Sequence, residues 1–284
     1  MLVHTIEEVR QQIKKWRAEG LTIGLVPTMG ALHSGHKSLF DESVKKCDKT
    51  VISIFVNPIQ FCPGEDFEKY PRTLENDCSI AKSAGVDLVF APNAKEMYPD
   101  AQMMTGDFLT YVVPPFFKVN MLCGKSRIGH FDGVCTVVNK LFNIVQPDWA
   151  FFGEKDYQQF VIIKKMVNDL NIPVKIQGCP LIREESGLAI SSRNKYLNDS
   201  EKGDALALFN ILTNIKRCYN SGITDINALK ETAYGFLNEK HSLEYLEFRD
   251  NDTLEAKTVA DDNTRVLIAL KLGEVRLIDN MLIK

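Results

Sequence analysis

The most constraining feature of this sequence is the alternation of short apolar runs with longer amphipathic segments over residues 1–180. The apolar runs, many of them β-branched, predict buried strands at 21–26, 50–56, 86–90, 149–152 and 174–178. Helices are expected among them, at 1–20, 35–46, 73–84, 136–145 and 156–170. Apolar strands that alternate with helices are typical of a parallel sheet covered on both faces. The predicted fold class is therefore α/β, with a Rossmann-like, doubly wound sheet.

The pattern changes after residue 180. Helices are expected at 200–218 and 226–238, a strand at 243–248, and a hairpin formed by 265–270 and 274–278. This order predicts a smaller C-terminal α+β lid domain over residues 181–284. The connecting segment 181–194 is rich in polar side chains, so we expect the active site near this junction. The irregular segment 99–131 is expected to form a cover.

Composition excludes several classes of protein. The 284 residues carry a net charge of −3 without a basic stripe, which argues against a nucleic-acid partner. No apolar run is long enough to span a bilayer, and no secretory signal is evident, so we expect a cytoplasmic protein without a membrane partner. The seven cysteines lack C-x-x-C spacing, which argues against disulfides and zinc sites.

A glycine-containing turn after the first predicted buried strand carries two histidines. It consists of Met29, Gly30, Ala31, Leu32, His33, Ser34, Gly35 and His36. Ligands bind beyond the carboxyl ends of such strands, where a helix N-terminus offers N–H groups to an anion. Both histidines can face one side of the first helical turn and donate hydrogen bonds to phosphate oxygens. Two surface histidines on a helix cap are the simpler interpretation, but the glycine turn favours phosphate chemistry.

The segment His33-Ser34-Gly35-His36 resembles the HxGH signature of the nucleotidyltransferase superfamily. That superfamily includes class I aminoacyl-tRNA synthetases, adenylyl- and cytidylyltransferases, and pantothenate synthetases. The resemblance implies attack on the α-phosphate of a nucleotide, and it leaves the substrate open.

A second segment, 55–61, follows the next predicted strand and contains Asn57 and Gln60. Side-chain amides can bind hydroxyls and carboxylates of a polar substrate, although a plain Asn-Pro turn would also explain the pattern. The segment resembles the FVNPxQF motif of the pantothenate synthetase family. That resemblance implies that Gln60 contacts pantoate and β-alanine.

Two further blocks match the same family. Residues 65–72 resemble its EDxxxYPR block, whose acidic residues could equally be a solvated face, and Asp77 matches an acidic position near magnesium. One carboxylate together with ATP phosphates is a typical magnesium arrangement. Residues 127–131 resemble its RPGHF block, with Ile128 in place of proline. Arg127 would be available to an anionic group, and His130 is expected to be structural.

The remaining blocks concern ATP. Residues 151–159 resemble the FFGEKDxQQ motif, which implies ATP binding by Gly153, Glu154, Lys155 and Asp156 and pantoate binding by Gln159. An ordinary capped helix would explain Asp156 alone. In segment 182–194, the hydroxyls of Ser191 and Ser192 are followed by Arg193, which together form a good polyphosphate clamp. A polar linker is the simpler alternative. The segment resembles the family's counterpart of the synthetase KMSKS loop, which implies ATP contacts by Ile182, Ile190, Ser191, Ser192 and Arg193.

Together the blocks occur in family order between residues 27 and 197. The resemblance implies a homodimeric ligase that joins pantoate to β-alanine with ATP and Mg²⁺ through a pantoyl adenylate. The expected catalytic residues are His33, His36, Lys155 and Arg193. An aminoacyl-tRNA synthetase, a simple nucleotidyltransferase and a nucleotide-sensing module without catalysis remain as alternatives.

Overall fold

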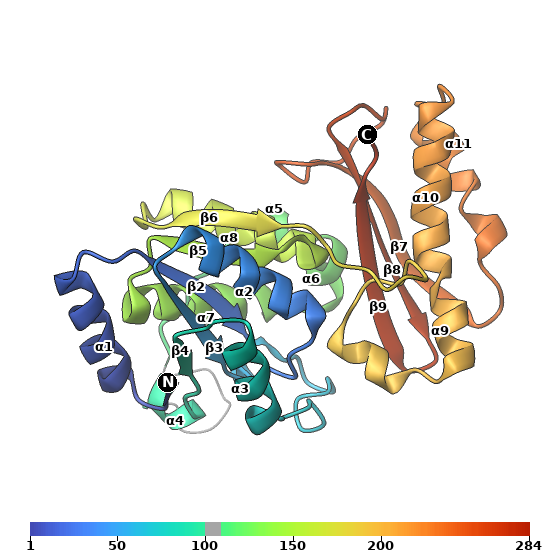
Figure 1. Cartoon of the computed structure of the whole chain (residues 1–284). Helices are drawn as coiled ribbons and strands as arrows, with labels where there is room; N and C mark the ends of the chain where they lie inside the picture. Colours follow the sequence, from blue (N-terminus) through green and yellow to red (C-terminus); the bar gives the residue numbers. More distant parts are fainter. Residues whose placement is uncertain (100–108) are drawn as a thin grey trace. The chain divides into compact units, whose positions relative to one another are not determined.

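The structure, a computed structural model of the chain, describes residues 1–99 and 109–284 (Figure 1). The chain divides into two compact units. The first comprises Met1–Glu154 and Ile162–Pro180, and the second comprises Lys155–Val161 and Leu181–Lys284. No helix within the described ranges has the length and hydrophobicity that crossing a membrane requires.

The first unit is built on a parallel sheet in the order β1-β4-β3-β2-β5-β6. Its strands are β1 (Leu2–Val3), β2 (Ile23–Thr28), β3 (Lys49–Ile54), β4 (Leu88–Phe90), β5 (Trp149–Gly153) and β6 (Lys175–Cys179). The predicted fold class is confirmed. Strand β1 was not predicted, and its residues were expected to lie in a helix. A strand of two residues has no periodicity and is defined by its pairing with β4.

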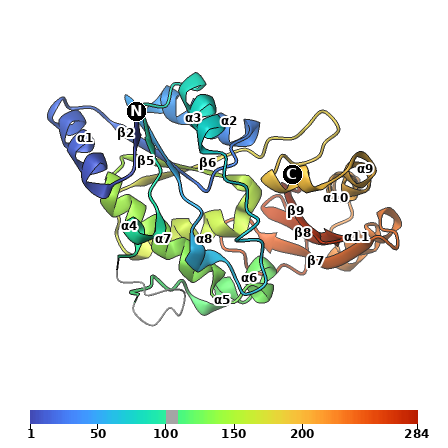
Figure 2. The ribbon, with the colours of Figure 1, turned by 90° about the horizontal axis from the view of Figure 1, so that it is seen from below.

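Helices cover both faces of this sheet. They are α1 (Ile6–Ala18), α2 (Ser34–Lys46), α3 (Leu74–Ser83), α4 (Ala94–Met97), α5 (Phe116–Val119), α6 (Leu122–Ser126), α7 (His130–Val145) and α8 (Tyr157–Asp169), whose first turn belongs to the second unit. Figure 2 shows the sheet between α2 and α3 on one side and α7 and α8 on the other. Of the irregular segment expected at 99–131, residues 100–108 lie outside the described residues.

Helix α7 begins at His130, well before the predicted residue 136. Gly129 precedes it with φ of 81°, a left-handed conformation that glycine adopts without strain, so the chain turns directly into the helix. The sequence between 130 and 136 therefore forms the first turns of a helix.

The strand order places the ends of β2, β3 and β5 side by side. The chain runs from β2 to β3 and β4 on one side, and later returns to add β5 and β6 on the other side of β2. Between β2 and β5 the winding reverses, which creates a topological switch point. In open α/β sheets ligands bind at this point, beyond the carboxyl ends of the strands.

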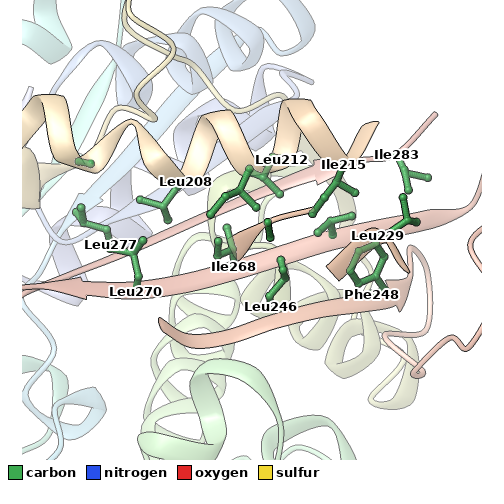
Figure 3. Packing of buried hydrophobic residues seen from close by; sticks show 14 of the residues in the cluster. Leu208, Leu212, Ile215, Leu229, Leu246, Phe248, Ile268, Leu270, Leu277 and Ile283 are labelled. Atoms are coloured by element: carbon green, nitrogen blue, oxygen red, sulfur yellow. The ribbon is translucent and has the colours of Figure 1, made fainter. Parts of the chain in front are cut away.

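The second unit contains an antiparallel sheet, β7 (His241–Asp250), β8 (Thr264–Leu272) and β9 (Val275–Leu282). Helix α10 (Ala207–Asn220) lies across this sheet, with Leu208, Leu212 and Ile215 directed at its apolar side chains (Figure 3). Before α10 come the short helices η3 (Ser192–Tyr196) and α9 (Asp199–Ala205), and after it come α11 (Ile226–Glu231) and η4 (Tyr234–Phe236).

Two helix predictions in this unit were too long. The segment expected as one helix at 200–218 is divided at Leu206, whose N–H bonds to Gly203 O, three residues back, as in a 3₁₀ turn. The helix expected at 226–238 ends at Glu231. Gly235 follows in η4, and glycine weakens helices.

Candidate active site

The loop after β2 is held in an unusual backbone conformation. Gly30 has φ of 85° and Ala31 has φ of 44°, a strained value for a residue with a side chain. A Cβ at Gly30 would lie 2.9 Å from both Asp77 Oδ2 and Ile54 Cγ2, so only glycine fits without a shift. Leu32 N–H donates to Asp77 Oδ1 at 2.8 Å and ties the loop to α3.

The two histidines contact each other at the start of α2. His33 precedes the helix with φ of −145°, and its N–H donates to Nδ1 of His36 at 3.3 Å. Their ring centroids are 4.0 Å apart. Because Nδ1 of His36 accepts a hydrogen bond, the neutral ring carries its proton on Nε2. That arrangement makes Nε2 a donor, which suits contact with a phosphate oxygen.

Asp77 lies beneath the loop and is fully buried. Besides Leu32 N–H, its Oδ1 accepts the hydroxyl of Thr73 at 3.0 Å. Its Oδ2 has no hydrogen-bond partner within residues 1–99 and 109–284. A buried carboxylate oxygen without a partner is costly, and a bound cation would supply one. No group of three or more metal-binding side chains occurs in this described part of the chain.

The segment after β3 places both predicted amides at the same edge of the sheet. Gln60 closes the short helix η1 (Pro58–Gln60), and its Nε2 donates to Met29 Sδ at 3.1 Å. Asn57 Nδ2 donates to Gln60 Oε1 at 3.0 Å and to Gly133 O at 3.2 Å. The hydroxyl of Tyr98 donates to Asn57 Oδ1 at 2.8 Å. Loops that follow two neighbouring strands, β2 and β3, are thus brought into contact.

Arg127 is engaged within the protein. Its Nε and Nη2 donate to the two carboxylate oxygens of Glu65 at 2.5 and 2.7 Å, and its Nη1 contacts His130 Nε2 at 2.9 Å. Burial alone would raise the pKa of Glu65, but the hydrogen bond and charge of Arg127 outweigh it and hold this pKa below its usual value. The possibility that this acid is only part of a solvated face is therefore wrong for Glu65. Anion binding by Arg127 stays a prediction.

His130 connects this ion pair to Gln60. Its Nδ1 lies 2.7 Å from Gln60 O, a carbonyl that can only accept, so Nδ1 carries the proton. In the neutral ring Nε2 then accepts from Arg127. The expected structural role of His130 fits this arrangement, in which it bridges a charged donor and the backbone of a predicted substrate-binding residue.

The segment after β5 is divided between the two units. Gly153 and Glu154 belong to the first, and Gly153 ends β5 next to the switch point. A Cβ at Gly153 would approach only Leu39 Cδ2, at 4.0 Å, so the backbone there is open to close approach. In the second unit, Lys155 Nζ lies 3.9 Å from a carboxylate oxygen of Asp156, and Gln159 is half-buried in α8.

The predicted phosphate clamp lies in the second unit. Ile190 N–H donates to Ile182 O at 3.0 Å, so these two predicted ATP contacts lie opposite each other in a small hairpin. Ser191 Oγ accepts from Arg193 N–H at 3.3 Å and caps η3, which contains Ser192 and Arg193. Both serines and the arginine are half-buried.

Two adjacent residues of β9, Asp279 and Asn280, bond to Arg183, the neighbour of Ile182, and to Lys155. Asp279 accepts two hydrogen bonds from Arg183, at 2.7 and 2.9 Å, within the hairpin. Asn280 Nδ2 donates to Lys155 O at 3.0 Å. Sequence reasoning missed both residues. Both lie beyond the strand expected at 274–278, which in the structure continues to Leu282.

Known proteins resemble this chain over nearly its whole length. The family model for pantoate-beta-alanine ligase matches residues 1–282. A pantothenate synthetase of Clostridium novyi (strain NT) is 49% identical over 284 residues, covering 99% of this chain and 98% of that protein. The crystal structure of pantothenate synthetase from Thermus thermophilus has a TM-score of 0.92 at 39% identity and covers 99% of each chain.

A further solved structure carries ligands. It is the pantoate-beta-alanine ligase from Francisella tularensis, complexed with beta-gamma ATP and beta-alanine. Its TM-score is 0.82 at 35% identity, covering 100% of this chain and 97% of that chain. The family resemblance inferred from the motifs is thereby confirmed.

Proposed function

Because the chain belongs to the pantoate–β-alanine ligase family, we propose that it joins pantoate to β-alanine at the expense of ATP and releases pantothenate, AMP and pyrophosphate. The observation that carries this proposal is the family match over residues 1–282. The paired histidines at the helix N-terminus beside the switch point support it, since phosphate groups bind at such positions.

The first step is adenylation. A carboxylate oxygen of pantoate attacks the α-phosphorus of ATP, a new P–O bond forms, and the bond to pyrophosphate breaks. Gln60 and Gln159 hold pantoate. Negative charge that develops on the phosphate oxygens is stabilised by hydrogen-bond donors and cations, namely His33, His36, Lys155, Ser191, Ser192 and Arg193. The nucleotide is held by residues 29–36, Gly153, Glu154, Asp156, Ile182 and Ile190.

The second step is aminolysis. The neutral amine of β-alanine attacks the carbonyl carbon of the pantoyl adenylate, the C–O bond to AMP breaks, and the amine loses a proton. The predicted residues include no covalent nucleophile, so acceleration comes mainly from positioning. Residues 181–284 act as a lid that excludes water from the mixed anhydride.

Magnesium accompanies ATP in this proposal. When bound, it neutralises phosphate charge. Asp77 is the proposed protein ligand, through Oδ2, because Oδ1 already accepts two hydrogen bonds and Oδ2 has no partner within residues 1–99 and 109–284. The enzyme is further proposed to act as a cytoplasmic homodimer in the synthesis of vitamin B5 for coenzyme A.

The direct test is to measure AMP and pyrophosphate release from ATP and Mg²⁺ with pantoate, with and without β-alanine. We expect sustained AMP release only with both substrates, together with a product of the mass of pantothenate. Absence of turnover would support a nucleotide sensor instead. Pyrophosphate exchange driven by a different acid, such as an amino acid, would support the synthetase or simple nucleotidyltransferase alternatives.

The histidine assignment has its own test. His36→Ala should reduce pyrophosphate exchange by about 100-fold, the effect of losing one donor to the transition state. The variant should keep the circular dichroism spectrum of the wild type, because His36 is only half-buried. Wild-type exchange by this variant would refute the catalytic role of His36.

A further inference from the structure

Asn57 is one of the three amides that the sequence assigned to the substrate, with Gln60 and Gln159, and its surroundings indicate another task. Its side chain is 1% exposed, and Tyr98 beside it is 4% exposed. Nδ2 uses both of its hydrogens within the protein, on Gln60 Oε1 and Gly133 O. Oδ1 accepts the hydroxyl of Tyr98. The Asn57 side chain therefore has no N–H left to offer to a substrate.

The direction of every hydrogen bond in this chain of contacts follows from one backbone carbonyl. Gly133 O can only accept, so the Asn57 atom beside it is the amide nitrogen. That nitrogen can only donate, so the Gln60 atom beside it is Oε1. Asn57 then presents Oδ1 to Tyr98, whose hydroxyl must donate. Amide orientations are ordinarily ambiguous, but here the network removes the ambiguity.

Helix packing keeps the Gly133 carbonyl in place. A Cβ at Gly133 would lie 2.3 Å from Ile59 O and 2.7 Å from Gln60 Cα, so α7 and η1 touch through backbone atoms. His130 adds the hydrogen bond to Gln60 O. The segment that carries Gln60 is thus fixed against α7 from two directions.

Tyr98 completes the network as its last donor. Burial raises the pKa of Tyr98, so the hydroxyl keeps its proton at any physiological pH. Without the hydroxyl, Asn57 Oδ1 would be left unsatisfied, and the orientation of its amide would lose its main support.

We infer that Tyr98 and Asn57 are positioning residues that orient the Gln60 amide so that it presents N–H groups, and not its oxygen, to the substrate. This inference rests on the proposed role of Gln60 in binding pantoate. The described residues give Nε2 one acceptor, the weakly accepting Met29 Sδ, and a second N–H remains for a ligand. Gln60 accordingly selects carboxylate or hydroxyl oxygens. It would meet β-alanine through the carboxylate and not through the ammonium, which only donates.

The test combines steady-state kinetics with a double-mutant cycle. Tyr98→Phe should raise the KM for pantoate about tenfold, as expected when a buried acceptor loses its donor, and leave the KM for ATP unchanged. Gln60→Ala should raise the KM for pantoate, and adding Tyr98→Phe to it should cause no further rise. Tyr219→Phe, which removes an exposed hydroxyl bonded to Asp262, is the matched control and should leave both constants unchanged.

The outcomes separate the inference from the proposed function. If Gln60→Ala leaves the KM for pantoate unchanged, the assignment of Gln60 to pantoate fails. If Gln60→Ala raises this KM but Tyr98→Phe multiplies it further in that background, Tyr98 does not act through Gln60 and the inference is overturned.

A second variant tests the orientation without touching Tyr98. Gln60→Glu keeps an oxygen for Asn57 but replaces the donor with an acceptor, so pantoate binding should fall further than in Gln60→Ala. Pantoate binding by Gln60→Glu equal to that of the wild type would show that Gln60 presents its oxygen, which contradicts the inference.

Discussion

Replacing Gly133 by alanine would press a methyl group against the backbone of the short helix η1. The new Cβ would lie 2.3 Å from Ile59 O, whereas ordinary contacts begin at 3.4 Å. Helix α7 and the short helix η1 would therefore have to separate by about 1 Å, and a displacement of that size at a binding site can cost about 100-fold in rate. Because η1 carries Gln60, we expect the loss in kcat/KM for pantoate, with little change in the KM for ATP.

The effect on stability has two parts of opposite sign. Crowding costs roughly 1–3 kcal/mol. Alanine is the better helix former by about 1 kcal/mol, which offsets part of that cost. The net result should be a free energy of unfolding lower by about 1 kcal/mol.

Gly203→Ala provides the matched control. Gly203 also lies in a helix, α9, but a Cβ there meets nothing within 4 Å. That variant should gain about 1 kcal/mol of stability and keep wild-type kinetics. Urea unfolding and initial-rate kinetics of the two variants supply the comparison. If Gly133→Ala were as stable and as active as Gly203→Ala, the contact between α7 and η1 would not position Gln60.

Two further predictions concern buried carboxylates. Asp77→Asn keeps an oxygen for Leu32 N–H but removes the charge. The Mg²⁺ concentration for half-maximal activity should therefore rise at least about tenfold, while the fold is retained. An unchanged Mg²⁺ requirement would exclude Asp77 as a ligand. Asp279→Ala leaves Arg183 without its carboxylate partner and should lower the free energy of unfolding by about 3 kcal/mol. Asp262→Ala, which removes an exposed ion pair with Lys284, should lower it by less than about 1 kcal/mol. Urea unfolding of the two variants measures both losses. Equal losses in the two variants would contradict the importance assigned to burial.

The sequence by itself determined the fold class and the places where chemistry occurs. Apolar runs of strand length and amphipathic helices follow from interactions within a few residues, so their periodicity is visible without a structure. Given a parallel sheet, segments that follow its strands must lie at one edge. The loops after β2, β3 and β5 are those that the motifs had marked.

Only the tertiary structure decided which side chains act on one another. Tyr98 meets Asn57 across 41 residues, Arg127 meets Glu65 across 62, and Arg183 meets Asp279 across 96. The pairing of β1 with β4 is of the same kind. Such contacts depend on how distant segments pack. Packing decides which polar groups become buried, and buried polar groups need hydrogen-bond partners. Neither can be read from a local sequence pattern.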